Sequence, residues 1–237
     1  MKGVDPDFRQ FARRTNYDHK FIDANDANEC LVATISGTYP NAEFMLYRFK
    51  VKLFNSDISI SVTDTTKIDL QIDNGGITAL IGIKDYFLVA VEEDDESKVF
   101  KIFPNGSYEQ VLDKYVYDFF RIDKGRILAA GSNQPPTMYL SEDDGDHWVG
   151  FKGMPAYMIS AKYSMVGDSL VGSYNSQLFT TRLTTDEYHL RALKNDGLET
   201  NEITSLSVFK DSVYVTSYTG VFTRSKAAFF DTKAVNP

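Results

Sequence analysis

The side chains that most often carry acid–base, nucleophilic or metal chemistry are few in this sequence and far apart along it. The three histidines are His19, His147 and His189, and no two of them have the H-x-x-x-H or H-x-H spacing of a zinc site. The only cysteine, Cys30, lies in an apolar stretch, where a small buried hydrophobe is expected. No glycine-rich phosphate-binding loop occurs. We therefore predict no metal, no cofactor and no catalytic thiol, while a cysteine–histidine pair formed across space stays open from sequence.

Acidic side chains are the second candidate group. The run of residues 92–96 offers several hard oxygens of the kind that bind Ca²⁺, and Asp143, Asp144 and Asp146 invite the same interpretation. The run lacks the alternate spacing and the glycine of a dedicated calcium loop, so a solvated hairpin loop is the favoured interpretation.

Tyrosines in short polar stretches are the third candidate group. A flat ring with a hydroxyl gives a sugar an apolar face to stack on, and neighbouring Asn and Ser side chains supply hydrogen bonds. The predicted ligand-binding residues of this kind are Tyr39, Asn133, Tyr157, Tyr174 and Tyr218. The alternative interpretation is that these side chains only cover the ends of strands.

An internal repeat indicates the elements that position these residues. A turn followed by a short apolar strand recurs five times, and the second residues of the turns are positions 28, 85, 125, 168 and 211. The spacings between these positions are 57, 40, 43 and 43 residues, and a propeller blade of four strands takes about 40–50 residues. Segments that alternate with a period of two precede the turns, as at residues 77–83 and 203–209. The sequence therefore predicts five units of four antiparallel strands.

Two parts of the repeat are weaker than the rest. In the first unit, strands are predicted at residues 44–51 and 58–62, and a long polar connection over residues 63–76 would explain the spacing of 57. The outer hairpins of the last two units are degenerate and are predicted at residues 178–190 and 221–230.

One specific motif lies on the outer hairpin of the third unit. Ser141, Asp143, Gly145 and Trp148 have the spacing S-x-D-x-G-x-x-W. The side-chain oxygens of Ser141 and Asp143 can accept hydrogen bonds from N–H groups of the turn, and Gly145 can take the positive φ of a tight reversal. Trp148 can then anchor the return strand in apolar neighbours, so we expect it to be largely buried.

This motif resembles the Asp-box of the BNR-repeat β-propellers, with His147 where that motif usually carries Thr. The segments 195–198, 203–206 and 219–222 resemble, in their order along the chain, the short sequence patterns of Asp-box and two-component-sensor propellers. The resemblance implies an all-β fold, a β-propeller of four-stranded antiparallel blades, with an Asp-box that serves folding and is remote from ligands. We predict five blades in a closed ring, with a fragment of a six- or seven-bladed ring as the alternative, and a β-sandwich as the competing topology. Residues 19–237 are expected to form a single propeller domain, and residues 1–18 a tail or a ring-closing strand.

Sialidases share the Asp-box and the propeller. That resemblance requires an arginine cluster, a tyrosine–glutamate nucleophile pair and an acidic proton donor at the centre of six blades. Here Phe120-Arg121-Ile122-Asp123 is only faintly similar to the Arg-Ile-Pro start signal, because it falls in a middle repeat and lacks the proline. The sequence is therefore interpreted as a sialidase-type or sensor-type propeller without the sialidase catalytic set.

Composition limits the possible partners. The 237 residues include 33 Asp+Glu against 25 Lys+Arg, and the net charge of −8 disfavours nucleic acid. A single cysteine excludes an internal disulfide. No apolar run approaches the roughly 20 residues of a membrane span, and the first residues lack the apolar segment of a signal peptide.

These observations favour a non-catalytic binding module that recognises a glycan or a protein partner through its loop face. The alternative from the enzyme class is a glycan-active hydrolase or lyase with carboxylates in the central channel, for which Asp118 and Asp123 are the residues to test. A third hypothesis is a scaffold or sensor ring inside a larger assembly. Rings of the resembling families are mostly extracytoplasmic, so a periplasmic or cell-surface location is expected.

Overall fold

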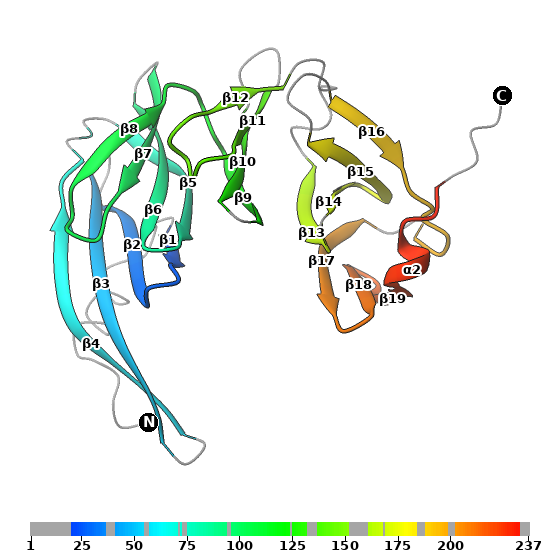
Figure 1. The fold of residues 1–237 in the computed structure, drawn as a ribbon, viewed down its shortest axis with the longest axis horizontal. Helices are drawn as coiled ribbons and strands as arrows, with labels where there is room; N and C mark the ends of the chain where they lie inside the picture. Colours follow the sequence, from blue (N-terminus) through cyan, green and yellow to red (C-terminus); the bar gives the residue numbers. More distant parts are fainter. Residues whose placement is uncertain are drawn as a thin grey trace. The chain divides into compact units, whose positions relative to one another are not determined.

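The computed structural model describes residues 20–36, 41–54, 57–70, 72, 75–93, 96–123, 125–131, 137–151, 161–167, 169–183, 188–198 and 202–232. The predicted tail or ring-closing strand at residues 1–18 lies outside these described residues. Nearly all of the described secondary structure is β-strand (Figure 1).

The strands form five antiparallel sheets, in each of which consecutive strands are neighbours (Figure 1). The first sheet consists of β1 (Lys20–Ala24), β2 (Glu29–Ser36), β3 (Asn41–Phe54) and β4 (Asp57–Ile68). The second sheet consists of β5 (Gly75–Ile83), β6 (Tyr86–Glu93), β7 (Glu96–Ile102) and β8 (Tyr108–Leu112). The third sheet consists of β9 (Asp118–Asp123), β10 (Arg126–Gly131), β11 (Thr137–Ser141) and β12 (Val149–Gly150). The fourth sheet consists of β13 (Lys162–Val166), β14 (Ser169–Tyr174), β15 (Gln177–Leu183) and β16 (Tyr188–Ala192). The fifth has three strands in the described part of the chain, β17 (Ile203–Phe209), β18 (Ser212–Ser217) and β19 (Gly220–Ser225). Such sheets are propeller blades, and the all-β propeller class predicted from the repeat is confirmed.

The chain divides into two compact units. The first comprises Met1–Phe119 together with Asp144–His147, and its core includes the fully buried Leu31, Phe44 and Phe87. The second comprises Phe120–Asp143 and Trp148–Pro237, and its core includes Val171, Val213 and Phe229. None of the helices in the described segments is long and apolar enough to cross a membrane.

In the second and third sheets the second strand is buried on both faces, which explains the continuous apolar runs of the repeat there. All residues from Tyr86 to Val91 in β6 are buried, and so are those from Ile127 to Gly131 in β10. Strands buried on both sides read as unbroken apolar segments and not as alternating ones.

The turn between first and second strands recurs because it needs a positive φ. The residues that adopt it are Asn28 (φ 62°), Lys84 (44°), Gly125 (90°), Gly167 (64°) and Lys210 (53°). Two-residue hairpin turns match the twist of the strands only with positive φ, which Gly and Asn adopt most easily.

The first unit corrects one prediction. Residues 63–68 belong to β4 and residues 75–76 to β5, so the predicted long polar connection over residues 63–76 is wrong. The spacing of 57 comes instead from the long hairpin of β3 and β4, which carries a bulge between Arg48 and Phe49. Polar residues are compatible with this outer strand because one face of an antiparallel sheet can meet water.

The last blade corrects a second prediction. The hairpin predicted at residues 221–230 is replaced by β19 and a one-turn helix, α2 (Lys226–Phe229). Ser225 caps this helix, since its Oγ accepts a hydrogen bond from the N–H of Ala228 at 3.3 Å. The two alanines that follow Lys226 favour helix over strand.

Candidate functional site

The structure describes two of the five predicted ligand-binding residues. Tyr39, Asn133 and Tyr157 lie outside the described residues. Tyr174 ends β14 and Tyr218 forms the turn between β18 and β19, so both belong to the second unit. Both lie at the end of their sheets where the first strand begins. In the fourth sheet, Ser173 is next to Tyr174 and pairs with Lys162, the first residue of β13. In the fifth sheet, Ser217 is next to Tyr218 and pairs with Ile203, the first residue of β17. We call this end of the fourth and fifth sheets the loop face.

Tyr218 is presented outward by a turn that its neighbours hold. Its side chain is 79% exposed. The Oγ of Ser217 accepts the N–H of Thr219 at 3.1 Å and lies 3.0 Å from Thr219 Oγ1. Such a serine turn fixes the backbone on both sides of Tyr218. The exposed aromatic ring is therefore a defined feature of the loop face.

Tyr174 stands on a turn that is tied to the neighbouring sheet. Asn175 has φ 53°, and its carbonyl accepts the N–H of Ile203 at 2.9 Å. The side-chain amide of Asn195, which is buried, donates to the carbonyl of Ser176 at 2.9 Å. These bonds couple the Tyr174 turn to the start of β17 and to the segment before it. Tyr174 itself is half-buried.

A cluster of hydroxyl groups lies beside these turns. Thr204 Oγ1 is 2.8 Å and Ser205 Oγ is 2.7 Å from Thr216 Oγ1. The register of β17 against β18 shifts between Ile203 and Ser205, and this bulge makes Thr204 an extra residue. Bulges commonly re-aim side chains at the ends of sheets. We call Thr204, Ser205 and Thr216 the hydroxyl cluster.

A lysine completes this arrangement. Lys162 Nζ donates to the carbonyl of Ile203 at 3.3 Å, next to the bulge. The loop face thus offers one exposed aromatic ring, three hydroxyls and an ammonium group, which suit hydrogen bonding and stacking with a polar ligand. Chemistry that needs paired carboxylates is not available from these residues.

Sequence reasoning missed the hydroxyl cluster although a signal was present. Ile203-Thr204-Ser205-Leu206 has a counterpart in Ile77-Thr78-Ala79-Leu80, where β5 carries a bulge between Ile77 and Ala79. Thr78 Oγ1 donates to the carbonyl of Val116 at 2.5 Å. A threonine after the first isoleucine of this pattern therefore marks a bulge in both strands.

The two residues of the hydrolase alternative lie at opposite ends of one strand. Asp118 and Asp123 are the first and last residues of β9. At about 3.3 Å per residue their Cα atoms are roughly 17 Å apart along the strand, and the side chain of Asp123 lies outside the described part. Glycosidase carboxylates lie about 5–9.5 Å apart on either side of one bond. Burial raises the pKa of Asp118, while a hydrogen bond from the N–H of Phe119 opposes this shift.

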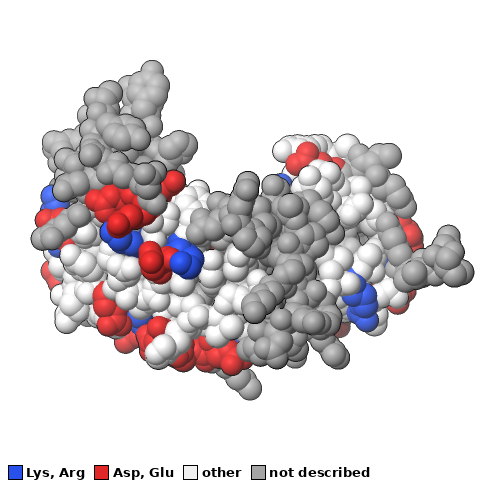
Figure 2. Space-filling model, turned by 90° about the horizontal axis from the view of Figure 1, so that it is seen from above, with Lys and Arg blue, Asp and Glu red and all other residues white. Residues whose placement is uncertain are grey.

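Two glutamates of the acidic run, Glu93 and Glu96, face Lys98, while Asp94 and Asp95 lie outside the described residues. Lys98 Nζ lies 2.6 Å from Glu96 Oε2 and 3.7 Å from Glu93 Oε2, and the hydrogen bond with Lys98 lowers the pKa of Glu96. Acidic and basic side chains are interspersed on the face seen in Figure 2. Across the described ranges, no group of His, Cys, Asp and Glu could hold a metal ion.

Cys30 is buried within β2, and burial raises the pKa of its thiol to about 11, with a smaller contribution from Asp23. A thiol in this environment stays protonated at neutral pH, and the thiolate is the nucleophile. Cys30 therefore acts as a core residue.

The turn within Ser141–Trp148, which we call the Asp-box turn after its resemblance to that motif, is ordered by its own side chains. Ser141 Oγ donates to Asp143 Oδ1 at 2.9 Å and accepts the N–H of Asp143 at 3.4 Å. Gly145 has φ 87°, the conformation that the reversal requires. Trp148 is partly buried.

Two lysines from the second sheet hold this turn in the first unit. Lys84 Nζ lies 2.5 Å from Asp144 Oδ2, and Lys101 Nζ donates to the carbonyl of Asp144 at 3.1 Å. Lys101 also pairs with Asp146, and its ammonium lies 4.3 Å from the centre of the Tyr86 ring. These contacts explain why residues Asp144–His147 group with the first unit. They give the turn a structural role.

No protein-family model matches this chain, and no curated protein matches it either. Among solved structures it is similar to YCF48 bound to a D1 peptide, with TM-score 0.51, 11% identity and coverage of 88% of this chain and 69% of that one. The dihydro-heme d1 dehydrogenase NirN matches with TM-score 0.50, 14% identity and coverage of 90% and 46%. A sialidase mutant from Trypanosoma rangeli with trans-sialidase activity matches with TM-score 0.44, 9% identity and coverage of 90% and 45%. The chain thus spans about half the length of the last two proteins, and it shares the β-propeller fold with YCF48 and NirN.

Proposed function

We propose that this chain is a non-catalytic propeller module that binds a protein partner through the loop face. The observation that carries the proposal is Tyr218, an aromatic side chain 79% exposed on a hydrogen-bonded turn in the same blade as the hydroxyl cluster. Exposed tyrosines supply contact area at low entropic cost and are enriched in protein interfaces. In this proposal Tyr218 is the anchor, and Lys162 and the hydroxyl cluster orient polar groups of the partner.

One comparison supports a protein ligand. The structure of YCF48, which shares the fold, contains a bound peptide. Fold likeness is a weak argument for function, because sites are grafted on folds. The proposal therefore rests first on the residues of the loop face. An extracytoplasmic location, which the resemblance to BNR-repeat propellers implies, is part of the same proposal.

A glycan is the second candidate ligand. Tyrosine rings and hydroxyls suit a sugar, and Tyr174 and Tyr218 both stand on loop-face turns. Against this, only the ring of Tyr218 is largely exposed and Tyr174 is half-buried, so the described loop face offers a sugar one stacking platform and not two. We therefore rank a glycan below a protein ligand.

The test begins with a thermal-shift screen of the purified chain against glycans of several classes and against pools of synthetic peptides. A ligand that binds only the folded state raises the melting temperature. The affinity of each hit is then measured by calorimetry for the native chain, Tyr218→Ala and Tyr174→Ala. Because a hot-spot tyrosine contributes about 2 kcal/mol or more, Tyr218→Ala should weaken binding at least tenfold.

Phe209→Ala is the matched control. Phe209 is 62% exposed in the same blade, but it ends β17 at the opposite turn of the hairpin. Its replacement should leave the affinity unchanged. If a ligand binds both tyrosine variants as tightly as the native chain, the loop face is not the binding surface. The same conclusion follows if Phe209→Ala weakens the affinity as much as the tyrosine variants do.

A further inference from the structure

The outer strand of the fifth sheet has a free edge within the described part of the chain. The sheet order is β17-β18-β19, and β19 has no described neighbour on its other side. The N–H of Lys226 donates to the carbonyl of Asp211, and this register directs the backbone groups of Phe222 and Arg224 toward β18. The N–H and C=O groups of Val221 and Thr223 therefore point away from the sheet. Unpaired strand edges of this kind accept additional strands.

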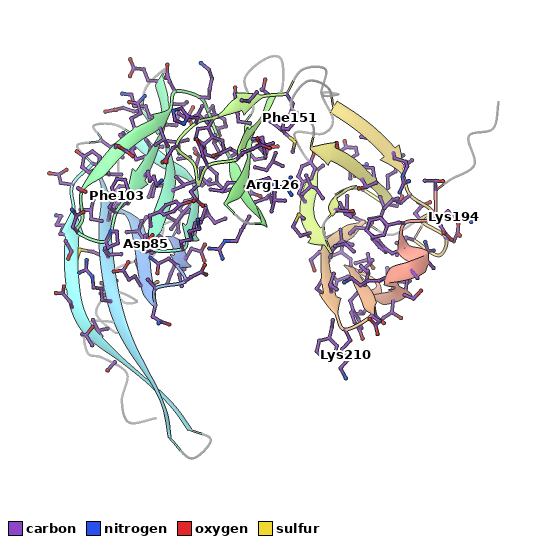
Figure 3. All side chains as sticks on the ribbon, in the orientation of Figure 1. Asp85, Phe103, Arg126, Phe151, Lys194 and Lys210 are labelled. Atoms are coloured by element: carbon purple, nitrogen blue, oxygen red, sulfur yellow. The ribbon has the colours of Figure 1, made fainter. Side chains whose placement is uncertain are left out.

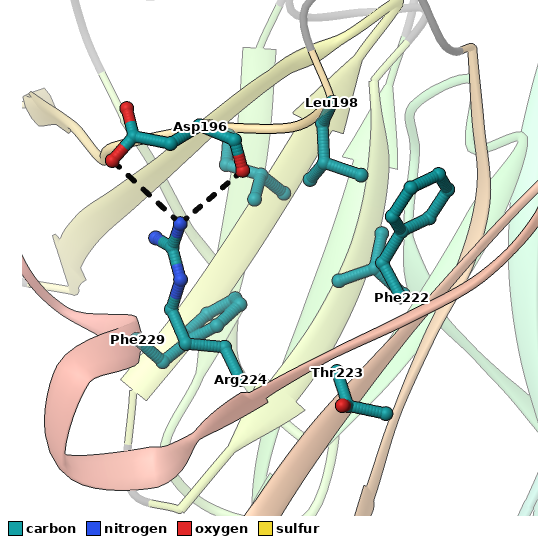
Figure 4. A pocket seen from close by; sticks show the side chains of 8 residues that line it. Asp196, Leu198, Phe222, Thr223, Arg224 and Phe229 are labelled. Atoms are coloured by element: carbon teal, nitrogen blue, oxygen red, sulfur yellow. Dashed lines mark hydrogen bonds and ion pairs between the residues drawn. The ribbon is translucent and has the colours of Figure 1, made fainter.

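A small apolar groove lies against the same strand. It encloses about 120 Å³ between β15, β19, α2 and the segment before β17 (Figure 4). The side chains that line it are Leu178, Asp196, Leu198, Val215, Phe222, Thr223, Arg224 and Phe229. An apolar cavity of about 150 Å³ admits benzene, so this groove has room for one apolar side chain.

The rim of the groove is fixed by Arg224. Its Nη1 donates to the carbonyl of Lys194 at 2.9 Å, and its Nη2 lies 3.4 Å from the carbonyl and 3.9 Å from Oδ2 of Asp196 (Figure 4). These bonds hold the segment before β17 against β19. The groove is consequently preformed.

Basic side chains surround this region of a chain whose net charge is −8. The guanidinium of Arg191 lies 3.5 Å from the carbonyl of Phe230, and the backbone N–H of Lys194 donates to the backbone carbonyl of Asp231. Figure 3 labels Lys194 near α2. Lys226 begins α2 beside the end of β19. Within the described residues, neither Lys194 nor Lys226 forms an ion pair; Arg224 adds a fourth cation, and the nearby acids are Asp196, Asp211 and Asp231. The local charge is therefore complementary to an acidic ligand.

We propose that β19 accepts an extended acidic segment of a partner protein as an added strand, with one apolar side chain of that segment in the groove. The hydrogen bonds come from Val221 and Thr223, the apolar contact from the groove, and the charge preference from Arg191, Lys194 and Lys226. Strand addition of this kind takes affinity from the backbone and specificity from pockets for alternate side chains. Val221 of this edge pairs with Thr216 of the hydroxyl cluster, but the proposal uses the β19 edge and the groove and not Tyr218, so it does not depend on the proposed function.

The experiment uses the full chain and a phage-displayed library of random dodecapeptides, selected at low salt. Selected peptides are synthesised with a fluorescent label and measured by anisotropy. The expected peptides carry Asp or Glu on both sides of a Leu, Met or Phe. N-methylation of single peptide amides should then weaken binding about tenfold at every second position and leave the positions between unchanged, because only alternate amides face β19.

Variants of the chain locate the site. Thr223→Pro removes an outward N–H and should weaken binding about tenfold, while Thr223→Val, which keeps it, should not. Lys226→Glu should weaken binding about threefold at low salt, and Lys114→Glu, the same change at an exposed lysine of the first unit, should have no effect.

Three results would overturn the proposal. They are the absence of selected peptides, an N-methylation profile without a period of two, and peptides that bind Thr223→Pro as tightly as the native chain. A fourth is a dimer that Thr223→Pro converts to a monomer, because a second copy would then occupy the edge. If Thr223→Pro does not fold, the N-methylation profile decides the question on the native chain.

Discussion

Lys101 Nζ lies 2.5 Å from Asp146 Oδ1, although the Lys101 side chain is only 8% exposed. Lys101 lies in β7 and Asp146 in the turn between β11 and β12, and their pairing fixes the Asp-box turn to β7. A buried ammonium needs partners on all sides, and the carbonyl of Asp144 and the ring of Tyr86 supply the others. The Asp-box turn is therefore held by contacts from outside its own hairpin.

Replacing Lys101 with Met should destabilise the chain by about 1–2 kcal/mol. Breaking a buried pair costs more than this when the remaining charge stays buried, but Asp146 is half-exposed and can be rehydrated. Urea unfolding followed by the emission of Trp148, the only tryptophan, measures the change. Lys84→Met is the control, since the exposed pair of Lys84 and Asp144 contributes about 0–1 kcal/mol. Equal losses for the two variants would contradict the buried role of Lys101.

The repeat made the fold predictable from sequence, whereas the contacts that hold it were not. Turn residues such as Lys84 and Lys210 and the apolar second strands are local signals, and they recur in the sequence at blade spacing. The pairing of Lys101 with Asp146 joins residues 45 apart, so no local pattern carries it. A lysine inside the apolar stretch 99–103 was the only hint. The length of β4 was missed because polar residues in an outer strand look like a loop.

The candidate site was predictable only in part. Tyr218 stands on a short turn between two strands, and its exposure agrees with that position. The hydroxyl cluster depends on a bulge, which shifts the strand register without changing the alternation that sequence reveals. The helix α2 was missed because a hairpin was expected from the other blades, while Ser225 and the following alanines favoured a helix locally.

Gly82→Ala should destabilise the chain by about 1–3 kcal/mol, because the added methyl group has no room. A Cβ at this position would lie 2.5 Å from the carbonyl oxygen of Ala24, and the N–H of Gly82 already bonds to Asp23 Oδ2 at 2.8 Å. Gly76→Ala in the same strand is the control, since nothing lies within 4 Å of its Cβ. That variant should be neutral or slightly stabilising. Denaturant unfolding compares the two, and a tolerated Gly82→Ala would mean that β1 and β5 do not approach this closely.

Lys210→Gly should stabilise the chain by about 0.5–1 kcal/mol. Lys210 has φ 53° at the tip of the turn between β17 and β18 (Figure 3). A side chain in this conformation costs about 1–2 kcal/mol, and the greater freedom of Gly in the unfolded chain offsets part of the gain. Lys210→Ala is the matched control, because it also removes the contact with the Phe209 ring but keeps the unfavourable φ. A melting temperature for Lys210→Ala equal to that of Lys210→Gly would show that the backbone conformation is not the cause.

Asp118→Asn should stabilise the chain at neutral pH and have no effect in acid. Burial raises the pKa of Asp118 above its ordinary value of about 3.9, so the unfolded chain releases the proton first as pH rises. Stability therefore falls between the ordinary pKa and the higher folded value, and the loss stays constant above both. Asparagine keeps an oxygen that can accept the N–H of Phe119 but carries no charge.

Melting temperatures of the native chain and Asp118→Asn across pH measure this difference. The two melting curves against pH should coincide near pH 3, where Asp118 is protonated in both the folded and the unfolded native chain. At pH 7 the melting temperature of Asp118→Asn should be higher than that of the native chain. A variant that melts lower than the native chain at pH 7 would mean that ionised Asp118 has a stabilising partner. A separation that is the same at all pH values would assign the effect to packing and not to charge.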